Sequence, residues 1–84
     1  MIQQKKSLSM PKVIGRYQKL PVYRIEWVES NPLNGLSALR IVRRINIYTV
    51  AFNNCIQGNY PISDEGWEQA NKRFDEVLPQ LRKS

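Results

Sequence analysis

The chain has 84 residues and a formal net charge of +6, which comes from 13 basic and seven acidic residues. Its content of 42% apolar and 24% charged residues is typical of a globular protein and argues against a disordered one. A chain this short buries only about 60% of the surface that it exposes when unfolded. We therefore expect one domain with one small core.

The cysteine content indicates a reducing compartment. Cys55 is the only cysteine, so the chain cannot form an internal disulfide, whereas small secreted domains usually contain several. Lys5 and Lys6 are not followed by the apolar run of about 7–15 residues that a signal peptide requires. No stretch approaches the roughly 20 apolar residues of a membrane span. We expect a cytoplasmic protein without membrane contact.

The basic residues are concentrated in the first three quarters of the chain. Residues 1–63 contain nine basic and two acidic residues, whereas residues 64–84 contain four basic and five acidic residues. This asymmetry indicates a polyanion or an acidic protein surface as the partner. It also has an interpretation without a partner, since a net charge of this size keeps many small domains soluble.

The first elements predicted in chain order are an arm and two strands. Residues 1–11 show no periodicity and predict a flexible basic arm, so that the folded domain comprises residues 12–84. Residues 12–17 are a short strand candidate that contains a glycine, and residues 19–21 end in a proline and predict a turn.

Residues 22–28 form the clearest predicted strand. Tyr23, Ile25 and Trp27 alternate with Arg24 and Glu26, which is the two-residue period of a half-buried strand. The alternation predicts that the three apolar side chains face the core and that the two charged ones face outward.

The segments that follow predict a loop and an element of ambiguous type. Residues 29–35 contain Asn-Pro and Asn-Gly and predict a loop. Residues 37–46 are ambiguous: residues 37–45 fit a helix without any misplaced residue and Asn46 could end it, although β-branched residues in this segment favour a strand. We favour a short helix and keep the strand as the alternative. Residues 47–52 have apolar side chains on both faces and predict an interior strand.

The last quarter of the chain predicts a helix. Residues 57–59 suggest a turn between two short extended pieces, residues 55–56 and 60–62. Ser63 or Asp64 is expected to cap a helix that Pro79 ends or kinks near Leu78. The apolar face of this helix comprises Trp67, Ala70, Phe74, Val77, Leu78 and Leu81.

These elements predict an α+β domain in which a small sheet of three or four strands, at least partly antiparallel, packs against the amphipathic C-terminal helix. The alternative is a small SH3-like open barrel with the same helix, which follows if residues 37–46 form a strand.

The residue types argue against an enzyme. The chain has no histidine, so Cys55 lacks an obvious activating base, and its four glycines stand alone instead of forming a phosphate-binding loop. Five of the seven carboxylates fall in the predicted final helix, where they suggest a solvated face. We expect no catalytic residues, no cofactor and no metal site.

The candidate binding residues are basic, with tyrosines between them. Charge neutralises phosphates, and aromatic rings stack on the bases of single strands. We expect a small non-enzymatic module that contacts nucleic-acid backbone. The alternative is a protein-binding adaptor, inhibitor or accessory subunit that docks on an acidic surface, and a homodimer is a further option. The candidate residues are Arg16, Lys19, Arg24, Arg40, Arg43 and Arg44.

Two of these arginines share a surface whichever way the ambiguous segment folds. Arg40 and Arg44 are four residues apart, and this spacing places them on one face of a helix and also on one face of a strand. Arg43 joins them in a helix, whereas a strand turns it to the opposite face.

Overall fold

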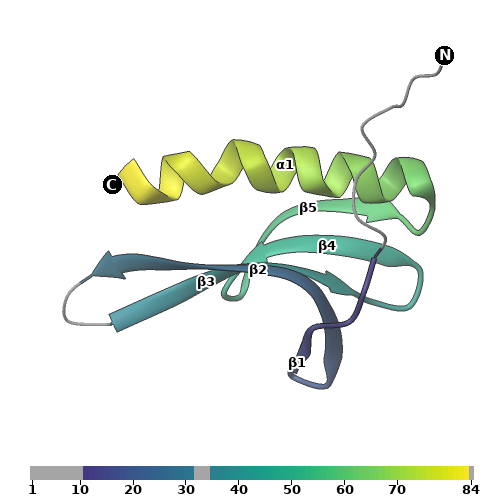
Figure 1. Cartoon of the computed structure of the whole chain (residues 1–84), viewed down its shortest axis with the longest axis horizontal. Coiled ribbons are helices and arrows are strands. Elements are labelled where there is room, and N and C mark those ends of the chain that lie inside the picture. Colours follow the sequence, from purple (N-terminus) through teal and green to yellow (C-terminus); the bar gives the residue numbers. More distant parts are fainter. Residues whose placement is uncertain (1–10, 32–34, 84) are drawn as a thin grey trace, which may run out of the picture.

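The computed structural model describes residues 11–31 and 35–83, which form a five-stranded antiparallel sheet and one helix (Figure 1). The α+β prediction is confirmed, with five strands instead of three or four. The sheet does not close into a barrel, so the SH3-like alternative is wrong. The strands lie in the sheet in their chain order, and the helix follows them in the sequence. The elements are β1 (Gly15–Tyr17), β2 (Leu20–Asn31), β3 (Gly35–Arg43), β4 (Ile47–Phe52), β5 (Cys55–Pro61) and the helix α1 (Asp64–Lys83).

The hydrophobic core lies between α1 and one face of the sheet (Figure 1). Leu39 and Ile41 of β3 are fully buried there, together with Phe74 of the helix. Every residue of the predicted apolar face of α1 belongs to this core or packs against it, so that prediction is confirmed. The core side chains of the helix are Trp67, Ala70, Phe74 and Val77, with Leu78 and Leu81 at the margin.

The favoured prediction of a helix at residues 37–46 is wrong. Residues 37–43 belong to β3, which pairs antiparallel with β2 on one side and with β4 on the other. An interior strand needs apolar side chains on both faces, and Val42 is buried on one face as Ile41 is on the other. Two ladders of backbone hydrogen bonds and two buried faces therefore outweigh the helical spacing. The predicted interior strand at residues 47–52 is confirmed as β4.

Strand β2 is longer than predicted at both ends. It begins at Leu20, because the chain reverses at Gln18 and Lys19, which both have positive φ angles of 52° and 70°. Pro21 therefore lies in the strand, and the turn predicted for residues 19–21 is displaced. At the other end β2 continues to Asn31 and β3 begins at Gly35, so the predicted loop at residues 29–35 is wrong for residues 29–31 and for Gly35. Residues 32–34 lie outside the described residues, as do residues 1–10 of the predicted arm.

A bulge in β2 reverses the predicted faces of this strand from Arg24 onward, whereas Tyr23 packs against the core as predicted. The register with β3 shifts between Val22 and Arg24, and a shift by one residue turns the following side chains to the opposite face. Arg24 and Glu26, predicted to face outward, lie on the α1 side instead, where Glu26 pairs with Arg82 at 3.2 Å. Trp27, predicted to face the core, is 55% exposed on the other side of the sheet.

Strand β5 is continuous, so the turn predicted at residues 57–59 is wrong. The register with β4 shifts at one point, where Val50 lies opposite Gly58 and Ala51 lies opposite Ile56. This bulge lets the strand pass through the Gln-Gly-Asn sequence without reversing. A Cβ atom at position 58 would overlap the ring of Tyr60, so any other residue there requires that ring to shift.

The start of α1 is as predicted, and its end is not. The Ser63 hydroxyl oxygen accepts a hydrogen bond of 3.0 Å from the backbone N–H of Gly66, which is the arrangement of an N-cap. The helix continues through Pro79 to Lys83, so the predicted end near Leu78 is wrong. Leu81 packs on the core and Arg82 pairs with Glu26, and these contacts hold the last turn. Within the described residues, no helix combines the length and the apolar character that crossing a membrane requires.

Alkaline pH should destabilise the domain through Tyr48. Burial raises the pKa of Tyr48 above its ordinary value of 10.0, with a further rise from Tyr23, although Arg43 lowers it. The pKa of Tyr48 is higher in the folded state than in the unfolded state, so ionisation of its hydroxyl disfavours the folded state. The stability of the folded state is therefore unaffected by this group below about pH 10 and falls as the pH rises through the folded pKa. Urea unfolding between about pH 9 and 11 should show a smaller fall in the unfolding free energy for Tyr48→Phe than for the parent. An equal fall in both proteins would contradict this assignment.

Candidate functional site

The sheet has one face covered by α1 and a second face that we call the open face. Figure 1 shows the helix along the first face and the β1–β2 hairpin turning towards the second. Alternation along the paired strands places Arg40, Val42 and Thr49 on the open face, since their neighbours in sequence belong to the core against α1. Other residues of the open face whose side chains the structure describes include Tyr17, Leu20, Val22, Ile25, Trp27, Ala38, Arg44, Ile47, Ala51, Ile56 and Asn59.

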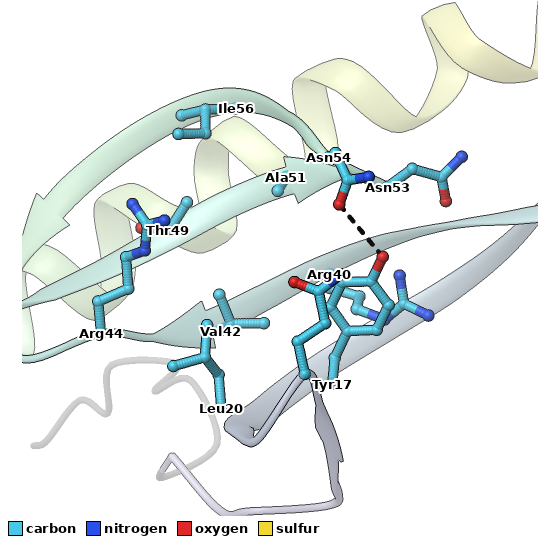
Figure 2. A pocket seen from close by; sticks show the side chains of 11 residues that line it. Tyr17, Leu20, Arg40, Val42, Arg44, Thr49, Ala51, Asn53, Asn54 and Ile56 are labelled. Carbon is cyan, nitrogen blue, oxygen red and sulfur yellow. Dashed lines mark hydrogen bonds between the residues drawn. The ribbon is translucent and has the colours of Figure 1, made fainter.

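Arg40 lies between two aromatic rings of the open face. Its guanidinium carbon is 3.8 Å from the centre of the Tyr17 ring and 5.9 Å from the centre of the Trp27 ring. Figure 2 shows the Tyr17 hydroxyl directed at the side chain of Asn54, to whose Oδ1 atom it donates a hydrogen bond of 3.3 Å. The rings come from β1 and β2, so the arginine is held by contacts from two neighbouring strands.

A pocket of about 100 Å³ lies next to Arg40 on the open face (Figure 2). Because one water molecule needs only about 10–15 Å³ of such space, the pocket has room for several waters or a small planar group. Its lining is mixed, with apolar side chains from the four strands β2 to β5 and with polar groups that include Thr49, whose hydroxyl donates to Asn59 at 2.8 Å. The residues that line it are Tyr17, Gln18, Leu20, Arg40, Val42, Arg44, Thr49, Ala51, Asn53, Asn54 and Ile56.

The structure brings two of the six predicted binding residues together at the pocket. Arg40 and Arg44 both line it, as their four-residue spacing predicts for either a helix or a strand. Lys19 is exposed in the turn between Gln18 and Leu20, which also line the pocket. Arg16 is exposed on β1 next to Tyr17, so the alternation of the strand turns it away from the open face.

Arg24 lies on the α1 side and is separated from Arg40 and Arg44. Its guanidinium donates hydrogen bonds to Asn71 at 2.7 Å and to Asp75 at 2.8 Å, and it stacks 4.0 Å from the centre of the Phe74 ring. The bulge in β2 places it there, so its assignment to the binding surface is corrected. Arg24 instead joins the sheet to the helix.

Arg43 is also separated from the other candidate arginines. It is the last residue of β3 and lies opposite Tyr48, whose ring belongs to the core beneath α1. Since adjacent residues of a strand point to opposite faces, Arg43 is exposed on the α1 side, whereas Arg44 lines the pocket. The strand at residues 35–43 is the reason for this correction.

Charge is divided between the two sides of the sheet. Of the open-face residues whose side chains the structure describes, Arg40 and Arg44 are charged and none is acidic, while the pairing of Glu29 with Leu36 gives this glutamate of β2 a position on the same face. The acidic side chains that the structure describes lie on the other side, since Glu26 pairs with Arg82 of the helix and the rest belong to α1 itself. Those of α1 are Asp64, Glu65, Glu68, Asp75 and Glu76.

Sequence reasoning missed Trp27 as a residue of this surface. The alternation at residues 22–28 predicts a core position, and only the register shift between Val22 and Arg24 reveals the exposed one. The side chain of Cys55 is exposed. Within the described ranges 11–31 and 35–83, no three residues of the types His, Cys, Asp and Glu lie close enough to hold a metal ion.

Comparisons of the chain with protein-family models, with curated proteins and with solved structures gave no match. Its function has therefore to be inferred from the geometry and charge of its own residues.

Proposed function

We propose that this protein is a non-enzymatic module that binds nucleic-acid backbone through its open face. The observation that supports this function is the pocket on that face, whose lining contains both Arg40 and Arg44 and no carboxylate. Positive side chains attract a polyanion, and the attraction is strongest where no carboxylate lies beside them. Lys19, which is exposed in the turn between Gln18 and Leu20, adds a third positive charge at the border of the pocket.

The packing of Arg40 suits it to phosphate binding. Its guanidinium is stacked on Tyr17 at 3.8 Å, so the side chain loses little conformational freedom when a ligand binds. Stacking occupies the flat face of the guanidinium and leaves its N–H groups at the edge, which can donate two parallel hydrogen bonds to a phosphate. Arg44 is exposed at the other end of the pocket and supplies a second charge.

Arg43 and Arg44 provide a matched test, because the two neighbours carry the same charge and point to opposite faces. Binding to a labelled oligonucleotide, measured by fluorescence anisotropy, should weaken steeply as salt is added. Arg44→Ala should lower the affinity and reduce the slope of log K against log salt by about 0.7 for a single strand. Arg43→Ala removes the same charge from the α1 side and should leave the slope nearly unchanged.

The double variant Arg40→Ala with Arg44→Ala should lose most of the salt-dependent binding, and circular dichroism should show that it remains folded. Absence of binding by the parent protein at low salt would overturn the proposal. Equal losses for Arg43→Ala and Arg44→Ala would also overturn it, since they would indicate a general effect of net charge and not a binding face.

Docking on an acidic protein surface is the second candidate function. It is favoured by Trp27 and Ile56, which are 55% and 52% exposed on the same face as Arg40, because tryptophan and arginine are enriched at the centres of protein interfaces. A protein partner whose binding depends on Arg44, combined with no binding to oligonucleotides, would support it. For either function we propose a cytoplasmic location, where the exposed thiol of Cys55 would stay reduced.

A further inference from the structure

Trp27 is the most unusual residue of the open face. An indole is a large apolar group, yet this one is 55% exposed, and it lies on the side of the sheet away from the core. It pairs across the strands with Ala38, a fully buried residue with a side chain too small to cover a ring. Its neighbour on the same face is Arg40, with the guanidinium carbon 5.9 Å from the ring centre. An exposed aromatic ring therefore stands next to the positive charge proposed to bind phosphate.

We propose that the open face binds single-stranded nucleic acid and that Trp27 stacks on one of its bases. This inference rests on the proposed function and names its substrate class. Every nucleobase has a π face, and stacking on an exposed aromatic side chain is the way in which many proteins hold single strands without reading their sequence. In a duplex the faces of the bases are stacked on one another, so a duplex gives the indole nothing to stack on.

The positions of the charges fit a strand that runs along β3. Trp27 lies opposite Ala38, Arg40 follows two residues later, and Arg44 lines the far side of the pocket. At about 3.3 Å per residue of strand, the line from Ala38 to Arg44 measures roughly 20 Å. This length accommodates a short run of nucleotides with one base on Trp27 and with phosphates at Arg40 and Arg44. The pocket between the two arginines lies on the same path.

The two tryptophans allow the stacking to be observed directly. Trp67 is buried in the core and 7% exposed, so a change of fluorescence caused by a ligand on the open face comes from Trp27. A single-stranded oligothymidylate and a duplex of mixed sequence are the two probes. We expect the single strand to quench the fluorescence of the parent protein and the duplex to leave it nearly unchanged.

Two substitutions at position 27 separate stacking from folding. Trp27→Phe keeps an aromatic ring, so it should bind the single strand with nearly the parent affinity while the quenching disappears. Trp27→Ala should lower the affinity for the single strand by about 5- to 150-fold, the range measured for loss of one stacked base. The weaker binding to the duplex should change little in the same variant.

Each other outcome overturns a particular statement. If Trp27→Ala keeps the parent affinity for the single strand while Arg44→Ala loses it, the stacking inference fails and the proposed function stands. If the parent binds neither probe at low salt, the proposed function fails as well. If sedimentation shows a dimer of the parent that Trp27→Ala dissociates, the ring is covered by a second copy of the chain, and the inference is overturned.

Discussion

Replacing Phe74 with alanine should lower the free energy of unfolding by about 3–5 kcal/mol. Phe74 is fully buried between α1 and the sheet. Its replacement by alanine leaves a cavity that the neighbouring side chains of the helix and of the sheet cannot fill. Its ring also carries the guanidinium of Arg24 at 4.0 Å, and that cation–π contact is lost with it. Chemical unfolding followed by circular dichroism measures the difference.

A loss of this size approaches the whole stability of a small domain, so a milder variant is needed as well. Phe74→Leu retains most of the buried volume and loses the ring, and it should be destabilised by less than Phe74→Ala but remain folded. Gln80→Ala changes an exposed position of the same helix and should stay within about 0.5 kcal/mol of the parent. A loss below about 1 kcal/mol for Phe74→Ala would show that α1 does not depend on docking against the sheet.

The elements predicted correctly are those whose signals are local. The apolar residues of α1 recur at helical spacing, and its N-cap residue Ser63 stands just before its first turn. Residues 47–52 carry β-branched and aromatic side chains on both faces, and they form an interior strand as predicted. In each case the local sequence pattern agrees with the packing in the structure, so the prediction of the element did not depend on distant segments of the chain.

The prediction for β3 failed because the helical period on which it rests assumes that only one face of the element is buried. Ile41 is buried against α1 and Val42 is buried on the open face, and side chains buried on both faces of a strand produce an apolar run that also fits a helix. What decides between the two is the presence of β2 and β4 on either side, and this information lies in other segments of the chain.

The candidate site was predicted in part for a related reason. Arg40 and Arg44 share a face in either secondary structure, so their grouping did not depend on the uncertain element. The bulge after Val22 places Arg24 and Trp27 on the faces opposite to those predicted, and no local feature of the sequence indicates this bulge. The partners that hold Arg24 are Asn71 and Asp75, 47 and 51 residues away in the sequence. Contacts over such separations are not contained in a local pattern.

Gly66→Ala is a substitution for which helix propensity and packing predict opposite results. Gly66 lies in the first turns of α1, where alanine is favoured over glycine by about 0.5–1 kcal/mol in an ordinary helix. A Cβ atom at this position would overlap the backbone carbonyl of Pro61, which is fixed at the end of β5 and cannot rotate away. We expect packing to prevail, with a loss of about 1–3 kcal/mol in the free energy of unfolding.

An exposed position of the same helix provides the comparison for Gly66. At Gln69 the alanine variant should be more stable than the glycine variant by about 0.5–1 kcal/mol, since no neighbouring backbone crowds that site. The order of stability of alanine and glycine should therefore reverse between positions 66 and 69, as measured by thermal and urea unfolding. If alanine is also the more stable residue at position 66, the chain between β5 and α1 is not held as close to the helix as the structure places it. The junction would then move without cost, and the orientation of α1 over the sheet would rest on the core contacts of Phe74 and its neighbours alone.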